Sequence, residues 1–202
     1  PEGRCKMPLL LLLPALLWAL PAQAADIPLA TVVRFNTLCA MCHEGECSGR
    51  LSFDSGIRVT ENHIRRHAGD VPPDVLHDLA RLLVHTKQAC SYYPMAIEIP
   101  KDGRWDSGTL ALLHNAKENA WFVPLGYLPA GRYRATLRQN GSMEGVAQII
   151  SDRFDIADFP LPCPEDGQIA FVFAVDRGSF HYLRFRSTKH QALSSLEIRW
   201  AD

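Results

Sequence analysis

Residues 168–186 read QIAFVFAVDRGSFHYLRFR, and this stretch decides the fold that we predict for the second half of the chain. Apolar and polar residues alternate over residues 168–175 and again over residues 180–186, which is the period of a half-buried β-strand. Between the two runs, Asp176-Arg177-Gly178 is typical of a tight turn. The stretch therefore predicts two short strands joined by a turn.

The same alternation recurs on both sides of this stretch, from residue 94 to residue 202. It is seen at residues 121–123, 132–138 and 193–200, and turn sequences such as Asn140-Gly141 separate the runs. Roughly seven or eight such strands predict an antiparallel β-sandwich, of which a jelly roll is one form. We predict a β-sandwich domain over residues 94–202.

The segment before residue 94 has a helical period instead. Residues 60–67 begin with a capping Thr and are followed by Ala68-Gly69, the start and stop signals of a helix. Apolar residues at 75, 79, 82 and 83 then recur at helical spacing. We predict a small helical domain over residues 25–93, and a domain of this size needs a staple or a cofactor. The fold class is α+β, with two domains.

The N-terminal residues predict export. Residues 7–24, MPLLLLLPALLWALPAQA, carry an apolar run that ends in small residues, and basic residues precede it. This is the layout of a signal peptide over residues 1–24, and the run is too short to span a membrane. We expect a periplasmic or secreted protein with no membrane span in the mature chain. The net charge of −1 gives no support for nucleic-acid binding.

Export places the cysteines in an oxidising compartment, where thiols are usually paired. Of the six cysteines, Cys5 lies in the predicted signal peptide, so an odd number stays in the mature chain. We predict a disulfide between Cys47 and Cys90 that closes the helical domain and leaves Cys163 unpaired. The alternative joins Cys90 to Cys163 and ties the two domains together.

A cysteine-rich motif lies in the helical segment, where residues 38–53 read LCAMCHEGECSGRLSF. Cys39, Cys42 and His43 form the C-x-x-C-H pattern of c-type haem attachment. The two thiols can form thioethers to the haem, and the adjacent imidazole can bind the iron. Alternatives are a thioredoxin-type redox pair, or a zinc site that adds Cys47. We predict one covalently attached haem c.

Residues 31–88 resemble the small monohaem c-type cytochromes of class I. The resemblance rests on the helix with Phe35 before CAMCH and on the helix VLHDLARLLVHTKQ after it. It implies a cytochrome c-like haem domain that carries single electrons. The chain departs from the family because no Met lies between Cys42 and Met95 to serve as the second axial ligand.

The resemblance also favours a position for that second ligand, near the end of the helix that precedes the last one. His63 and His67 lie four residues apart there and share one helix face. We assign the ligand to His67, with His63 as the alternative and an open site as a third outcome. His77 and His85 fall on the polar side of the last helix and are expected to face solvent.

The predicted function is electron transfer between redox partner proteins, with the β-sandwich as a docking module. Alternatives are a haem-based sensor or gas-binding protein, and a non-catalytic subunit of an exported oxidoreductase or polysaccharide-acting system. No catalytic motif stands out, so the chain is not expected to be an enzyme.

Arginines on the strands of the sandwich favour protein docking, namely Arg132, Arg134, Arg138, Arg184 and Arg186. Carbohydrate binding is less favoured, because the aromatic residues available for it are expected mainly in the core, namely Trp105, Trp121, Tyr127 and Tyr133.

Overall fold

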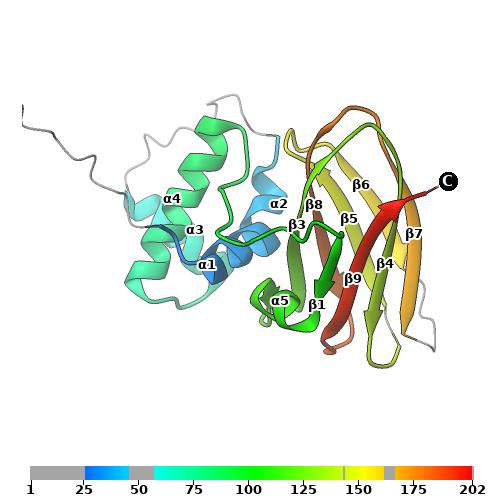
Figure 1. The fold of residues 1–202 in the computed structure, drawn as a ribbon. Coiled ribbons are helices and arrows are strands. Elements are labelled where there is room, and N and C mark those ends of the chain that lie inside the picture. The colour runs from blue at the N-terminus through cyan, green and yellow to red at the C-terminus, as the bar shows by residue number, and fades with distance from the viewer. Residues whose placement is uncertain (1–25, 46–56, 143, 162–166, 202) are drawn as a thin grey trace, which may run out of the picture.

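The computed structural model describes residues 26–45, 57–142, 144–161 and 167–201, and Figure 1 shows helices on one side and two β-sheets on the other. The helices are α1 (Leu29–Arg34), the π-helix η1 (Phe35–Cys39), α2 (Ala40–His43), α3 (Ile57–Ala68), α4 (Pro73–Ala89) and α5 (Ser107–Leu112). The strands are β1 (Arg104–Asp106), β2 (His114–Asn115), β3 (Ala120–Leu128), β4 (Gly131–Gln139), β5 (Gly145–Ser151), β6 (Ile156–Leu161), β7 (Gln168–Val175), β8 (Ser179–Ser187) and β9 (Leu193–Trp200).

The strands form two antiparallel sheets, which confirms the predicted β-sandwich. One sheet has the order β1-β9-β4-β7 and the other the order β2-β3-β8-β5-β6. Strands β7 and β8 follow each other in the chain but lie in different sheets. The turn at residues 176–178 therefore connects one sheet to the other, and the two strands that flank it, β7 and β8, are not paired with each other.

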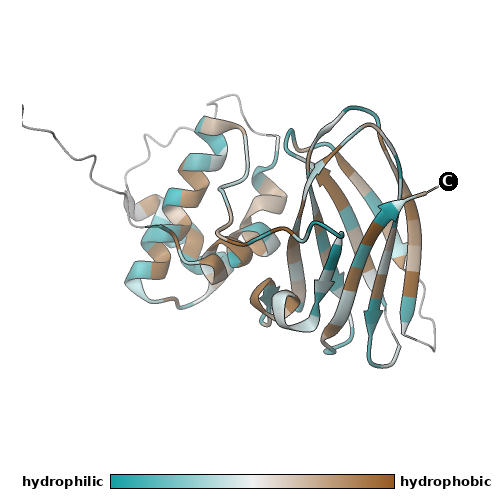
Figure 2. Cartoon of the chain, in the orientation of Figure 1, coloured by the Kyte–Doolittle hydropathy of each residue, from teal (hydrophilic) through white to brown (hydrophobic). Residues whose placement is uncertain are grey.

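Hydrophobic and hydrophilic residues alternate along the strands, as the colouring in Figure 2 shows, and buried side chains of both sheets form one core. Trp121 and Phe185 are register partners on β3 and β8, and their rings stack at a centroid distance of 5.4 Å. The opposite sheet contributes Leu137 and Leu196, which are completely buried. Burial of such side chains is the main favourable contribution to folding, and the sandwich has enough of them to form its own core.

The helices do not have a separate core. Their apolar side chains form one buried cluster with residues of the sandwich, and this cluster joins Phe35 and Leu79 to Phe122 of β3 and Ile150 of β5. The helical segment therefore shares its core with the β-sandwich, and the division of the chain into two domains between residues 93 and 94 stays a prediction. The physical reason for the shared core is that the helices bury their apolar faces against the outer face of a β-sheet.

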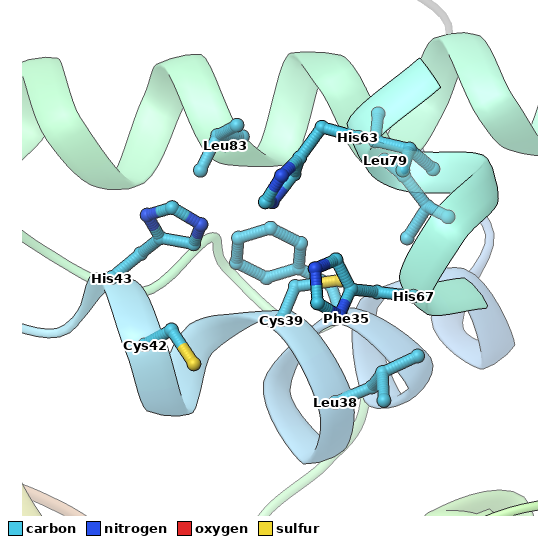
Figure 3. Close-up of a pocket in the computed structure, with 10 residues that line it drawn as sticks. Phe35, Leu38, Cys39, Cys42, His43, His63, His67, Leu79 and Leu83 are labelled. Carbon is cyan, nitrogen blue, oxygen red and sulfur yellow. The ribbon is translucent and has the colours of Figure 1, made fainter. Parts of the chain in front are cut away.

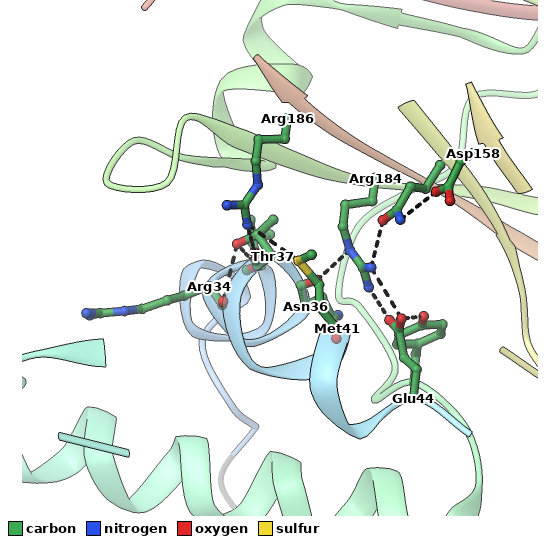
Figure 4. A network of polar contacts seen from close by, with 11 residues as sticks. Arg34, Asn36, Thr37, Met41, Glu44, Asp158, Arg184 and Arg186 are labelled. Carbon is green, nitrogen blue, oxygen red and sulfur yellow. Dashed lines mark hydrogen bonds and ion pairs between the residues drawn. The ribbon is translucent and has the colours of Figure 1, made fainter. Parts of the chain in front are cut away.

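A buried ion pair crosses this contact, as Figure 4 shows. Arg184 of β8 pairs with Glu44, and each side chain is 3% exposed. The hydroxyl of Tyr92 also donates to Glu44, and Arg184 donates to the carbonyl of Asn36 at 2.8 Å and to Gln148 at 2.9 Å. The prediction that Arg184 lies on an exposed docking face is wrong, since Arg184 is part of the interior.

Arg186, the next outward-facing residue of β8, makes a second polar contact between the sheet and the helices. It donates to the carbonyl of Thr37 at 2.8 Å and lies 3.4 Å from the sulfur of Met41. The other three arginines of the predicted docking face, Arg132, Arg134 and Arg138 of β4, are exposed. The five arginines therefore do not form one surface.

None of the helices in the described ranges is both long and apolar enough to cross a membrane. The predicted signal peptide, residues 1–24, lies outside the described residues.

Replacing Arg184 should destabilise the whole protein. Arg184→Met leaves the Glu44 carboxylate buried without its counter-charge, which typically costs about 3–5 kcal/mol. We expect a loss of that order in the free energy of unfolding, measured by urea denaturation. Arg104→Met is the matched control, because Arg104 also forms an ion pair, with Glu197, but its side chain is exposed. The stability loss of this control should be much smaller, because exposed ion pairs contribute little. Equal losses would show that burial of the Arg184–Glu44 pair does not matter.

Candidate functional site

The candidate site is a pocket of about 60 Å³ enclosed by three helical segments. Figure 3 shows its side chains pointing inward from η1 and α2, from α3 and from α4. The residues that line it are Phe35, Leu38, Cys39, Cys42, His43, His63, Ile64, His67, Leu79 and Leu83. The structure therefore brings together both thiols of the predicted motif and all three of the histidines that were assigned to the iron.

The motif sits where the first helix changes its winding. The hydroxyl of Thr37 donates to the backbone carbonyl of Val33 at 2.8 Å. The backbone carbonyl of Arg34 is a second acceptor at 3.2 Å. Such bonds compete with the backbone ladder, and π-turns occur often at functional sites. The π-helix η1 ends at Cys39, and α2 then ends at His43, after which Glu44 is extended. The short α2 thus places Cys39, Cys42 and His43 within one turn.

The two thiols differ in their surroundings. Both are free, but Cys42 is exposed whereas Cys39 is partly buried. Burial raises the pKa of the Cys39 thiol to about 11, against the smaller opposite effect of Arg34. A thioredoxin-type redox pair needs a thiol of lowered pKa as its nucleophile. The raised pKa of Cys39 therefore argues against the redox-pair interpretation.

The three imidazoles lie close together at the pocket. The ring centroids of His43 and His63 are 5.9 Å apart, with 72° between the ring planes. His63 and His67 follow at 4.7 Å, because residues four apart share one face of α3. Burial, and then the neighbouring His67 and His43, lower the pKa of His63. A lowered pKa keeps this imidazole neutral, the form that binds metals.

The rest of the pocket is apolar. Phe35, Ile64, Leu79 and Leu83 form its wall, and no acidic residue is among the described residues that line it. What the pocket offers is two thiols and three imidazoles around an apolar space.

The protein alone does not form a metal centre in the part of the chain that the structure describes. Within those residues, no three His, Cys, Asp or Glu side chains are grouped so that they could hold a metal ion. The prediction that the protein's own side chains form a metal site is therefore corrected for the described residues. The zinc alternative also needs Cys47, which lies outside the described residues.

Cys90 ends α4 in the left-handed conformation and is disulfide-bonded. Since Cys39 and Cys42 are free, its partner is not one of the described cysteines. Both Cys47 and Cys163 lie outside the described residues, so the pairing of Cys47 with Cys90 stays a prediction.

The remaining candidate ligands lie away from the pocket. His77 is exposed beside Asp78, as expected. His85 is not fully exposed: its ring contacts Tyr93 at a centroid distance of 5.1 Å. Met95 packs against both apolar clusters of the protein.

Sequence reasoning missed Glu44 and Arg184, which hold the motif in place, because nothing in a single sequence marks two residues 140 positions apart as partners.

The structure resembles solved β-sandwich proteins only distantly. Matches include CBM35 from Cellvibrio japonicus (12% identity, 41% of this chain and 64% of that chain, TM-score 0.29). A family GH115 4-O-methyl-α-glucuronidase matches with 9% identity over 69% of this chain and 26% of that chain, at a TM-score of 0.33. A family 29 carbohydrate-binding module matches with 16% identity over 43% of this chain and 63% of that chain, at a TM-score of 0.23. This chain spans less than two thirds of the length of each of these chains. No protein-family model and no curated protein matches the chain.

These comparisons correct two of our predictions. No family model matches the chain, and within the described residues no three His, Cys, Asp or Glu side chains are grouped so that they could hold a metal ion. The assignment to the c-type cytochromes is therefore wrong, and so is the function that followed from it, an electron carrier between redox partners. The physical reason is that the sequence resemblance covered one helical segment, whereas most of the ordered chain is a β-sandwich.

The two thiols should differ in reactivity in the apoprotein. Iodoacetamide should label Cys42 quickly near pH ~7.5 and Cys39 slowly, because the thiolate is the reactive form. Labelling of Cys39 should accelerate as the pH rises toward its pKa of about 11. Peptide mass spectrometry resolves the two sites, and guanidinium-unfolded protein, in which both should react alike, is the control. Equal rates in the folded protein would contradict the difference in burial.

Proposed function

We propose that the helical pocket covalently holds one haem c. The observation that carries this proposal is the convergence of Cys39, Cys42 and His43 on one apolar pocket, with a second imidazole facing His43. Two free thiols at this spacing suit thioether bonds to a porphyrin, and the adjacent imidazole suits axial ligation. The proposal concerns the cofactor alone and does not depend on a cytochrome fold.

The spacing of the imidazoles fits the group. A second ligand to the same iron would have to come from an imidazole close to His43. The ring of His63 lies 5.9 Å from that of His43, whereas the ring of His67 contacts that of His63, at 4.7 Å. We therefore propose His43 and His63 as the axial pair. The sequence resemblance favoured His67, which becomes the alternative.

The protein's own residues have distinct tasks in this site. Phe35, Leu79 and Leu83 keep water from the pocket, and Arg184 fixes the segment next to His43 through its buried pair with Glu44. When bound, the haem supplies an iron centre whose properties depend on its axial ligands and on the apolar surroundings.

We also propose that the protein is exported to the periplasm or secreted. The signal-peptide pattern of residues 7–24 and the disulfide at Cys90 both support this, since disulfides persist in oxidising compartments.

Covalent attachment is tested by producing the protein together with a haem c maturation system. The wild-type chain should retain its haem on a denaturing gel, since thioethers survive unfolding. Cys39→Ser combined with Cys42→Ser should lose it completely. Met41→Leu, a conservative change at an exposed position between the two thiols, is the matched control and should keep the haem. A colourless wild-type band would refute the proposal.

The same preparations decide the second axial ligand. His63→Ala should convert a low-spin absorption spectrum to a high-spin one, because one imidazole is lost from the iron. His67→Ala should leave the spectrum nearly unchanged, and circular dichroism checks that both variants are folded. The opposite result would return the ligand to His67.

We propose that the β-sandwich binds carbohydrate, instead of the redox partner protein that the sequence predicted. Trp105, Trp121 and Tyr133 are buried as expected, so none of the three is available to a ligand. Tyr127 and Phe180 are instead 60% and 46% exposed, and their rings form a T-shaped pair with a centroid distance of 6.2 Å and 74° between the ring planes. Adjacent exposed aromatic faces suit stacking on the apolar face of a sugar ring.

Affinity electrophoresis with xylan, β-glucan, mannan and polygalacturonate tests this second proposal. Carbohydrate binding predicts that at least one soluble polysaccharide in the gel retards the wild-type protein, since each transient complex is too large to migrate. Serum albumin in the same gels controls for sieving. Unchanged mobility in all four gels would count against carbohydrate binding by the sandwich.

A further inference from the structure

A groove of about 680 Å³ lies at one end of the sandwich, away from the helical pocket. Its residues come from the turn between β5 and β6, from the turn between β7 and β8, and from the adjoining strand ends. They include Tyr127 at the end of β3 and Phe180 at the start of β8. This volume lies within the ~300–1,000 Å³ that is usual for ligand sites.

The aromatic wall of the groove depends on a local irregularity of β3. The register with β8 shifts between Pro124 and Gly126, so Tyr127 becomes the partner of Phe180 on the exposed face. Such bulges re-aim side chains and occur often beside binding sites. Gly178 in the turn between β7 and β8 leaves room for the Tyr127 hydroxyl, which a Cβ at this position would overlap.

The interior of the groove carries polar groups on rigid strands. His181 is 6% exposed, and its Nδ1 lies 2.9 Å from the carbonyl of Ser179. Since a carbonyl only accepts, Nδ1 is the donor of this hydrogen bond. Ser151, the register partner of His181 on β5, is also buried, and its hydroxyl donates to Asp155 at 3.0 Å. The groove is therefore a built site with oriented polar atoms.

The rim of the groove mixes acceptors and donors. Three carboxylates and two guanidinium groups line it, from Asp152, Asp155, Asp176, Arg153 and Arg177. A sugar hydroxyl both donates and accepts, so it can bond to both kinds of group. An anionic chain would meet an excess of carboxylates, because charge complementarity is lacking there. The mixture fits an uncharged polyhydroxylated ligand.

We infer that this groove is the carbohydrate site and that it binds a neutral oligosaccharide, with Tyr127 and Phe180 as the stacking surfaces. The inference rests on the proposed carbohydrate binding and adds its location and the charge class of its ligand. His181 and the rim carboxylates bond to the sugar hydroxyls. Haem binding in the helical pocket is independent of it.

Isothermal titration calorimetry of the full chain tests this with cellohexaose, xylohexaose and mannohexaose as neutral probes and trigalacturonic acid as the charged probe. One or more neutral probes should bind, and trigalacturonic acid should bind more weakly. Tyr127→Ala and Phe180→Ala should each weaken the neutral complex by at least about tenfold, as expected for truncating an aromatic anchor. Both side chains are exposed, so neither change should unfold the protein. Trp200→Ala is the matched control, because Trp200 is 58% exposed and does not line the groove.

The outcomes distinguish the inference about the groove from the proposal that the sandwich binds carbohydrate at all. If the wild type binds a neutral probe but the Tyr127 and Phe180 variants bind it equally well, the groove is not the site. Stronger binding of trigalacturonic acid would overturn the charge class. If the wild type binds none of the probes and none of the four polysaccharides, the proposed carbohydrate binding itself fails.

Discussion

The buried pair of Arg184 and Glu44 is the interaction on which the rest of the structure depends. Both side chains are almost completely excluded from water, in a place where an unpaired charge would be very costly. Arg184 also donates to the carbonyl of Asn36, so one guanidinium holds the chain before and after the Cys39–His43 motif. Tyr92 completes the carboxylate's shell, and burial together with Glu44 raises the pKa of Tyr92, which keeps it a donor.

This arrangement makes the β-sandwich the scaffold of the helical pocket. The helices are short and share their buried cluster with Phe122 and Ile150 of the sheet. Small helical segments rarely supply enough apolar burial to be stable alone. The sheet supplies that burial, and two arginines of β8 fix the motif's position. The thiols and the imidazoles can then face one another across an apolar space.

Strand β8 also connects the two proposed sites. Phe180 and His181 at its start belong to the groove, whereas Arg184 and Arg186 further along hold the motif. The alternation of a strand sends these side chains to both faces of the sheet. A rigid central strand suits both tasks, because each site needs side chains held in fixed positions.

The sequence by itself determined the local features of this protein. Alternation predicted strands β4, β7, β8 and β9 closely, and helical spacing predicted α3 and α4, because these periods depend on neighbouring residues alone. The C-x-x-C-H spacing likewise identified Cys39, Cys42 and His43 as one group. Only the tertiary structure decided that β7 and β8 lie in different sheets, that Arg184 is buried rather than exposed, and that the rings of His43 and His63 come within 5.9 Å of each other. These outcomes depend on contacts between residues far apart in the chain, and a local pattern carries no information about which distant partner a side chain will meet.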